Sequence, residues 1–231
     1  MNTDAYPNLE FIGSPDTLRK IRTLDRSERQ VLSSSFAKCV SLIPTEWETS
    51  LASKEIFWVN VFQSSGFSEN VKPACSAELD AWVQRLVHEC YSIGTVTLEG
   101  YGFVVNPAES QQAQPWHIDY SMGYSTLLIP MSILTTGNST QYAVIEAPPA
   151  HLLEKAAGNP DDIDVDEFVR AGASVCARQL LVAPFSLLKL NFGGIHRGIP
   201  NTSGVHRNVF WISVLQKGFS KASEPRIQKF F

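Results

Sequence analysis

The 231-residue chain has few charged residues, 18% in total, and no long run of either sign. Its 19 basic and 23 acidic residues give a net charge of −4, so the sequence offers no basic surface suited to a phosphate backbone. We therefore expect neither nucleic acid nor a membrane as a partner, and the sequence leaves the oligomeric state open. Because 44% of the residues are hydrophobic, the chain can bury a full core.

Long hydrophobic runs and leader segments are also missing. An apolar stretch such as Leu180–Leu190 is interrupted by Pro184, Ser186 and Lys189, and it falls short of the ~18 residues that a membrane-spanning helix needs. The first residues, MNTDAYPNLEFIG, lack the basic start and apolar segment of a secretory signal. We therefore expect a cytoplasmic protein without a transmembrane segment.

Cysteine is scarce and dispersed. The four cysteines lie far apart and form neither a CxxC pair nor the framework of a small disulfide-rich domain. We therefore expect Cys39, Cys75, Cys90 and Cys176 to be reduced thiols.

The first part of the chain predicts mostly helices. The segment 14–16 predicts a helix start, because a capping hydroxyl precedes a proline suited to the first helical position. A second helix is expected to begin near residues 25 to 27. The clearest helix spans 76–91, where one apolar stripe recurs at helical spacing; its members are Leu79, Trp82, Val83, Leu86, Val87 and Cys90. The aromatic and β-branched segment 55–62 predicts a strand.

From residue 94 onward the pattern changes to short apolar runs separated by Gly, Pro and Asn, which is typical of a β-sandwich or barrel. The segment 148–172 predicts one or two short helices inserted between strands. We expect one domain, with helical support over 1–93, a β core over 94–217 and a tail over 218–231. The predicted strands of the core are 95–105, 125–134, 141–146, 173–181, 186–192 and 208–215.

The chain contains only five histidines, so an imidazole site can be assembled in few ways. His117 and Asp119 are separated by one residue, and in an extended strand residues i and i+2 project to the same face. The imidazole and the carboxylate are therefore expected to meet at a common point. A second imidazole would complete the facial arrangement of two histidines and one carboxylate that leaves positions open on Fe(II).

His196 is the best candidate for that second imidazole. It follows the apolar run SLLKLNFGG and precedes a predicted hairpin turn around 201–204, after which a return strand begins at Arg207. We therefore expect His196 and Arg207 on neighbouring antiparallel strands, a few residues from being opposite each other. The planar fork of an arginine can bind a carboxylate through two hydrogen bonds, which suits a dicarboxylate whose other end chelates the metal.

His206 is an alternative distal ligand, but no arginine follows it ten or eleven positions later, so His196 is preferred. His88 and His151 are expected to be solvated rather than functional. Arg197 is expected to point to the face opposite to His196.

The pattern of His117-Ile118-Asp119, a distal His196 and Arg207 eleven positions later resembles the Fe(II)- and 2-oxoglutarate-dependent oxygenases, and most of all their phytanoyl-CoA dioxygenase-like group. The resemblance covers residues 101–215. It implies a mainly β fold with flanking helices (α+β), whose core is a double-stranded β-helix of the jelly-roll, cupin-like type. It also implies that His117, Asp119 and His196 are the catalytic metal ligands.

The same resemblance implies a reaction. Fe(II) would be the cofactor, with 2-oxoglutarate and O2 as co-substrates and succinate and CO2 as products. The enzyme would oxidise an unactivated C–H bond of a small molecule by hydroxylation, desaturation or cyclisation.

Further residues are expected near the site. Asn106, which ends the first long strand, and Thr135, which follows TLLIPMSIL, occupy places where relatives often have a polar contact to the co-substrate, although either can simply cap a strand end. Trp211 lies four positions from Arg207 and thus on the same face of a regular strand. Five aromatic residues are candidates for a substrate pocket, and core packing explains each at least as well: Trp116, Tyr120, Tyr101, Phe103 and Trp211.

Two other functions fit the same kind of barrel. One is a cupin-like metal enzyme that acts as an isomerase or hydrolase without 2-oxoglutarate, and the other is a non-enzymatic ligand-binding barrel. Iron-dependent conversion of 2-oxoglutarate to succinate would separate the oxygenase from the first. Metal-free protein that keeps its full ligand affinity would indicate the second.

Overall fold

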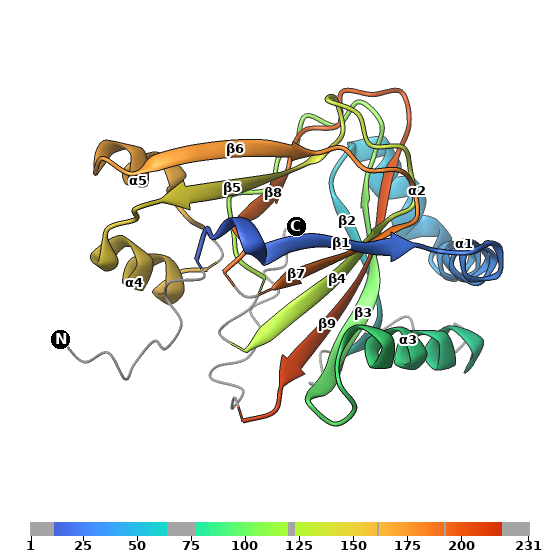
Figure 1. Ribbon diagram of the computed structural model, residues 1–231. Helices are drawn as coiled ribbons and strands as arrows, with labels where there is room; N and C mark the ends of the chain where they lie inside the picture. Colours follow the sequence, from blue (N-terminus) through green and yellow to red (C-terminus); the bar gives the residue numbers. More distant parts are fainter. Residues whose placement is uncertain (1–11, 64–76, 120–122, 161, 192, 219–231) are drawn as a thin grey trace.

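The computed structural model describes residues 12–63, 77–119, 123–160, 162–191 and 193–218, which form two antiparallel β-sheets with helices around them (Figure 1). The larger sheet has the strand order β1-β7-β4-β9-β3-β2, and the smaller one has the order β6-β5-β8. The strands are β1 (Leu18–Thr23), β2 (Phe57–Gln63), β3 (Val96–Asn106), β4 (Tyr124–Pro130), β5 (Thr140–Glu146), β6 (Ser174–Leu180), β7 (Ser186–Asn191), β8 (His196–Gly198) and β9 (Arg207–Gln216).

After β3 the chain passes back and forth between the two sheets. β4, β7 and β9 join β3 in the larger sheet, while β5, β6 and β8 form the smaller one. The segment before β4 runs along the open edge of β8, where His117 bridges His196 and the Gln114 N–H donates to the Gly198 carbonyl. This alternation is that of a double-stranded β-helix, so the predicted jelly-roll core is confirmed.

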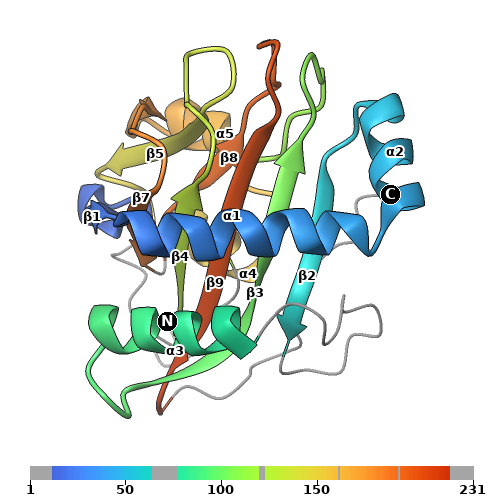
Figure 2. The same ribbon diagram turned by 90° about the vertical axis from the view of Figure 1, so that its right-hand side faces the viewer.

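Two of the helices, α1 (Arg26–Ser41) and α3 (Ala77–Cys90), cover one face of the larger sheet. The other helices of the described chain are α2 (Pro44–Ser53), α4 (Ala150–Gly158) and α5 (Val165–Arg170). α1 and α3 lie across the strands (Figure 2). Within the described residues, no helix has the length and apolar character required to cross a bilayer.

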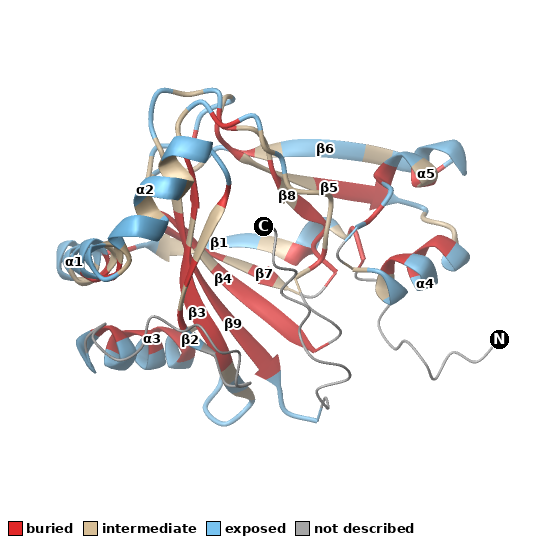
Figure 3. Ribbon diagram, turned by 180° about the vertical axis from the view of Figure 1, so that it is seen from behind, coloured by how far each residue is buried: buried red, intermediate tan, exposed pale blue. Residues whose placement is uncertain are grey.

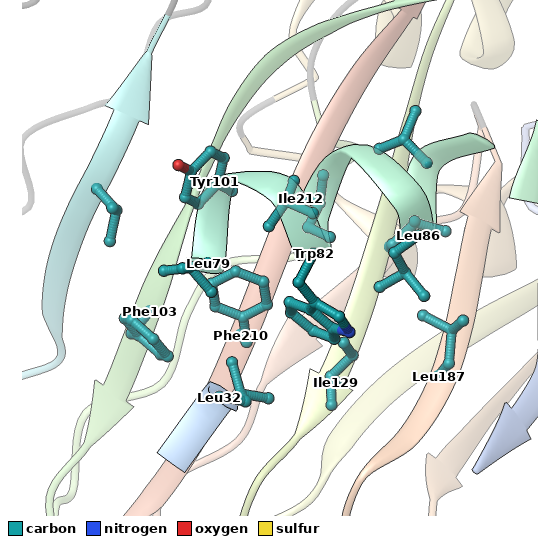
Figure 4. Packing of buried hydrophobic residues seen from close by; sticks show 14 of the residues in the cluster. Leu32, Leu79, Trp82, Leu86, Tyr101, Phe103, Ile129, Leu187, Phe210 and Ile212 are labelled. Carbon is teal, nitrogen blue, oxygen red and sulfur yellow. The ribbon is translucent and has the colours of Figure 1, made fainter. Parts of the chain in front are cut away.

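The main core lies between α3 and the larger sheet. The apolar stripe of α3 is buried as expected, apart from its last member, Cys90, which is half-buried. Phe210 of β9 is fully buried, and its ring centroid lies 5.8 Å from that of Trp82 and 4.8 Å from that of Phe103. Figure 4 shows these rings packed together with Ile212 beneath the helix. Phe210, Ile212 and Val214, which alternate along β9, all belong to this helix-facing core.

A second core lies between the smaller sheet and the inserted helices. α4 and α5 confirm the helices expected over 148–172, and they pack on Ala143 and Ile145 of β5 and on Ile118 and Ile195. The outermost strand, β6, is largely exposed, whereas β3, β4 and β9 are buried along most of their length (Figure 3). One face of the smaller sheet therefore packs against α4 and α5.

The helix start predicted at 14–16 is confirmed in part. Ser14 caps the turn and Pro15 occupies its first position, but the turn is a single 3₁₀ turn, because residues 18–23 pair with β7 at the edge of the larger sheet. One other local prediction is wrong. His196 and Arg207 do not lie on paired strands, because β8 pairs with β5 whereas β9 lies between β4 and β3. The side-chain amide of Asn201 donates to the carbonyls of Asn106, Pro107 and Val205, which fixes the intervening loop as a crossover between sheets.

The cysteines differ in part from expectation. Cys90 and Cys176 are free thiols, as predicted, but Cys39 is disulfide-bonded. Cys75 lies outside the described residues. Single cysteines far apart in a sequence give no indication of which residues the fold brings together, so this bond could not be predicted.

Candidate metal centre

His117 and His196 are held together by their own backbones. The His117 N–H donates to the His196 carbonyl at 2.9 Å, and the His196 N–H donates back to the His117 carbonyl at 2.9 Å. This reciprocal pair places both imidazoles on one face, with ring centroids 4.3 Å apart. Between the two predicted ligands, Ile118 points the other way and is buried in the second core. The extended segment therefore directs His117 and Asp119 to the same side, as predicted.

The three predicted ligands converge. Nε2 of His117 lies 3.6 Å from Oδ1 of Asp119, and Nε2 of His196 lies 3.5 Å from the same oxygen. All three candidate ligand atoms lie within 4.8 Å of one another. Two imidazole nitrogens and one carboxylate oxygen in this arrangement form a facial triad, which is the donor set suited to a divalent iron with open positions.

Backbone carbonyls fix the orientation of both rings. Nδ1 of His117 lies 2.8 Å from the Pro115 carbonyl oxygen, and Nδ1 of His196 lies 3.0 Å from that of Gly194. A carbonyl oxygen can only accept, so each Nδ1 carries the hydrogen and each Nε2 presents its lone pair toward Asp119. Hydrogen bonding of the second ring nitrogen is typical of histidines that bind metals.

The electrostatics favour the ligating state of His117. The pKa of its imidazole is lowered to about 4, first by burial and then by the nearby His196, while Asp119 partly opposes this shift. The ring is therefore neutral at neutral pH, and a neutral imidazole is the form that binds a metal ion.

Arg207 is a buried cation at the start of β9. Its Nη1 donates to the Ser139 carbonyl at 2.7 Å, with longer contacts to the carbonyls of Asn138 and Ile199. Burial lowers the pKa of the guanidinium to about 10, so it remains charged at neutral pH. Among the described residues no carboxylate pairs with it, and neither Nε nor Nη2 makes a hydrogen bond. A buried charge without a counter-ion is costly, so this fork is suited to an anionic ligand.

Two further polar groups lie beside Arg207. Asn106 is its direct partner in the β3–β9 register, and its Nδ2 donates to the Ile199 carbonyl. Oδ1 of Asn106 and the hydroxyl of Ser139 are buried, and neither has a hydrogen-bond partner in the part of the chain that the structure describes. Asn106 was expected here from the sequence. Ser139 was missed, because it acts on Arg207 through its carbonyl, which any residue possesses.

Other predicted residues lie elsewhere. Thr135 is exposed, and both its N–H and its hydroxyl donate to Oδ1 of Asn138, so it shapes the turn rather than facing the site. Tyr101 is 3% exposed and packs against Phe210 in the helix-facing core, on the opposite side of the sheet from Arg207.

The remaining aromatic candidates differ in position. The guanidinium of Arg197 stacks on the ring of Trp116 at 4.4 Å, and Trp116 packs against the second core. Arg197 therefore points away from His196, as expected. Trp211 lies on the face of β9 that carries Arg207, with its ring 6.3 Å from that of Trp58. Tyr120 lies outside the described residues.

The other histidines are not part of the cluster. His206, the alternative ligand, accepts a hydrogen bond from the Ala108 N–H through Nδ1 and stacks edge-on with Trp47. His88 and His151 are exposed, as expected. The geometry thus favours His196 over His206 as the distal member of the triad.

Comparisons with known proteins support the fold. No protein-family model and no curated protein matches the sequence. The structure is similar to that of AviO1 from Streptomyces viridochromogenes Tue57, with a TM-score of 0.55 and 17% identity over 92% of this chain and 95% of that one. It is also similar to HygX from Streptomyces hygroscopicus with nickel and 2-oxoglutarate bound, with a TM-score of 0.56 and 12% identity over 91% and 87% of the two chains.

A third similar structure is SnoK, a non-heme alpha-ketoglutarate-dependent carbocyclase from nogalamycin biosynthesis. Its TM-score is 0.53, with 11% identity over 87% of this chain and 79% of SnoK. At such low identity these likenesses show a shared fold. The chain is thus a double-stranded β-helix protein that carries a His-Asp-His facial triad.

Proposed function

We propose that the protein is an Fe(II)- and 2-oxoglutarate-dependent dioxygenase, most similar to the phytanoyl-CoA dioxygenase-like group, that oxidises a C–H bond of a small molecule. The proposal rests on one observation, the position of Arg207 relative to a facial triad whose two imidazole rings are fixed by backbone carbonyls. The guanidinium of Arg207, which has no carboxylate partner among the described residues, packs against Gly198, two residues along β8 from the ligand His196. HygX, which shares the fold, was crystallised with nickel and 2-oxoglutarate and with iron.

Each residue has a separate task in this proposal. His117, Asp119 and His196 would hold Fe(II) through three ligand atoms and leave its other positions open. Arg207 would bind the distal carboxylate of 2-oxoglutarate through Nε and Nη2, the two groups that have no partner among the described residues. When bound, the iron and 2-oxoglutarate supply the activation of O2, with conversion of 2-oxoglutarate to succinate and CO2.

The chain itself supplies position and charge balance. The triad contributes one carboxylate, and an imidazole that binds a metal through Nε2 carries no charge. A divalent cation and a dicarboxylate together with the guanidinium of Arg207 would therefore leave the site without net charge. Near-neutral charge balance favours binding of the metal and the co-substrate in a buried place. Asn106 lies beside the guanidinium and would orient the carboxylate or an accompanying water.

An anaerobic titration tests the proposal. Protein loaded with Fe(II) should bind 2-oxoglutarate and develop the visible absorption band of a metal chelate. His196→Ala should lose iron, measured as metal content, whereas Arg207→Gln should retain iron and bind 2-oxoglutarate at least tenfold more weakly. Iron bound without any 2-oxoglutarate band would contradict the proposal and favour a cupin-like metal enzyme.

A further inference from the structure

β9 presents two different faces. Phe210, Ile212 and Val214 pack in the core beneath α3, so Arg207, Trp211 and the other odd-numbered residues face the opposite way. This opposite face points toward the smaller sheet, because Arg207 contacts the Ser139 and Ile199 carbonyls there. It is therefore the face that looks into the interior of the β-helix, where the triad lies.

Three polar groups on this inward face have no partner among the described residues. Nε1 of Trp211, the hydroxyl of Ser213 and the hydroxyl of Thr126 are buried and make no hydrogen bond within that part of the chain. Their residues are only 4%, 1% and 2% exposed, respectively. Thr126 of β4 is directly opposite Ser213 in the β4–β9 register, and Trp211 lies two residues before Ser213 on the same face of β9. We refer to these three groups as the cluster.

The neighbouring strand β3 offers the hydroxyl of Ser213 no side-chain partner. On β3 the residue opposite Ser213 is Gly100, which has no side chain to offer as a partner. Unpartnered buried donors and acceptors are rare in folded proteins, because each loses its bonds to water without compensation. Valine and alanine would fill the same positions without that loss, so three such groups on one inward face indicate a ligand that satisfies them.

The cluster lies beyond the reach of the co-substrate contact made by Arg207. Ser213 is six residues from Arg207 on the same strand, a distance of about 20 Å at strand spacing. An extended 2-oxoglutarate molecule is much shorter than this. The cluster therefore belongs to a separate part of the interior, on the far side from the Arg207 guanidinium.

We propose that Trp211, Ser213 and Thr126 form a substrate-binding wall that recognises a neutral oxygen function of the substrate, such as a hydroxyl, ether or carbonyl group. This inference rests on the proposed oxygenase function and deepens it. The indole N–H can only donate a hydrogen bond, whereas the two protein hydroxyls can donate or accept one. Together they suit a substrate oxygen that accepts one hydrogen bond and an adjacent substrate hydroxyl that donates another. None of the three groups carries a charge, so an anion buried against them would lose its hydration without a counter-ion.

The test uses a neutral probe, cis-1,2-cyclohexanediol, with cyclohexanecarboxylate as its charged counterpart. On Mn(II)- and 2-oxoglutarate-loaded protein, paramagnetic broadening of the diol protons should place the bound diol near the metal. The double variant Thr126→Val/Ser213→Ala and the single variant Trp211→Phe should each weaken diol binding at least fivefold. Diol affinity that is the same in wild type and double variant, or tighter binding of the carboxylate than of the diol, would overturn the inference.

Thermal unfolding of the ligand-free protein separates recognition from a structural role. If the hydroxyls have no partner, the double variant should melt at the same temperature as wild type or higher. A melting temperature lowered by several degrees would mean that the fold already satisfies these groups, and the inference would be wrong. Ser125→Ala is the matched control, because its hydroxyl lies on the same strand but contacts Tyr91 and the Leu190 carbonyl on the other side; it should lower the melting temperature and leave diol affinity unchanged.

The same diol titration on metal-free protein, followed by saturation-transfer NMR, keeps the two proposals apart. Loss of diol binding in the variants would support the wall even if the protein bound no iron. Failure to bind iron and 2-oxoglutarate would instead overturn the proposed function alone.

Discussion

Arg207 packs directly against Gly198, the residue of β8 that has no side chain. A Cβ at position 198 would lie 2.3 Å from Nη2 of Arg207 and 2.5 Å from Oε1 of Gln114. Because β8 and β9 belong to different sheets, this contact brings the guanidinium of one sheet onto the backbone of the other, two residues from His196. The absence of one methyl group therefore sets the position of the cation relative to the triad.

Substitution of this glycine should displace Arg207 without touching the metal ligands. Gly198→Ala places a methyl group only 2.3 Å from Nη2 of Arg207, so the guanidinium has to move. We therefore expect iron content to be retained and 2-oxoglutarate affinity to fall at least tenfold, about 1.4 kcal/mol. The measurement is the anaerobic titration of the chelate band. Gly204→Ala is the control, because a Cβ there meets nothing within 4 Å. Equal affinity in both variants would show that the guanidinium position does not depend on Gly198.

The sequence identifies the triad but not this contact, for a physical reason. His117, Asp119 and His196 have side chains whose chemistry points to a metal, and the i, i+2 spacing of the first pair is visible in the sequence. Gly198 contributes the lack of a side chain, and Ser139 contributes a carbonyl that every residue has. Such roles depend on which strands the fold brings together, and no local pattern encodes them.

The core beneath α3 should be sensitive to loss of volume. Phe210 is fully buried and lies within 6.0 Å, centroid to centroid, of the rings of Trp82, Tyr101 and Phe103. Phe210→Ala should lower the free energy of unfolding by about 3–5 kcal/mol, because it leaves a cavity among rigid rings. Urea denaturation measures the change. Val169→Ala, at a position that is 52% exposed, should change it by about 0.5 kcal/mol or less.

Helix α3 and the crossover after β8 show where prediction from sequence succeeds and fails. The apolar stripe of α3 repeats at helical spacing, and burial of that stripe against a sheet needs no knowledge of distant residues. The segment after Gly198 contains Asn, Ser and Gly, which suit a hairpin and a crossover equally well. The difference is made by Asn201, whose amide bonds to carbonyls nearly a hundred residues earlier.

Removal of that amide should loosen the crossover. Asn201 is fully buried and its Nδ2 donates to three carbonyls at 2.8–3.0 Å. Asn201→Ala leaves these acceptors without a partner, so we expect the free energy of unfolding to fall by about 2–4 kcal/mol. Because the loop leads into Arg207, 2-oxoglutarate affinity should fall as well, while iron content is retained. Thr202→Ala, at an exposed neighbour, should leave both quantities nearly unchanged.

The stability of the metal-free protein should depend on pH through His117. Burial holds the pKa of this imidazole at about 4 in the folded chain, whereas an unfolded histidine has a pKa of about 6.5. Between these values the unfolded chain binds more protons, so the free energy of unfolding rises with pH across this window and falls on acidification. From pH 7 to pH 5 the loss attributable to His117 should be about 2 kcal/mol.

His117→Phe isolates this contribution, because a phenyl ring keeps the apolar contacts of the buried imidazole but does not titrate. Urea denaturation of both metal-free proteins at pH 7 and pH 5 gives the two losses, and carboxylates elsewhere in the chain contribute equally to both. We expect the free energy of unfolding of wild type to fall by about 2 kcal/mol more than that of the variant over this interval. The reason is that only in wild type does the unfolded chain bind a proton at position 117 that the folded protein does not bind. Equal losses would mean that His117 takes up its proton in the folded protein as readily as in the unfolded chain, which its burial beside His196 opposes.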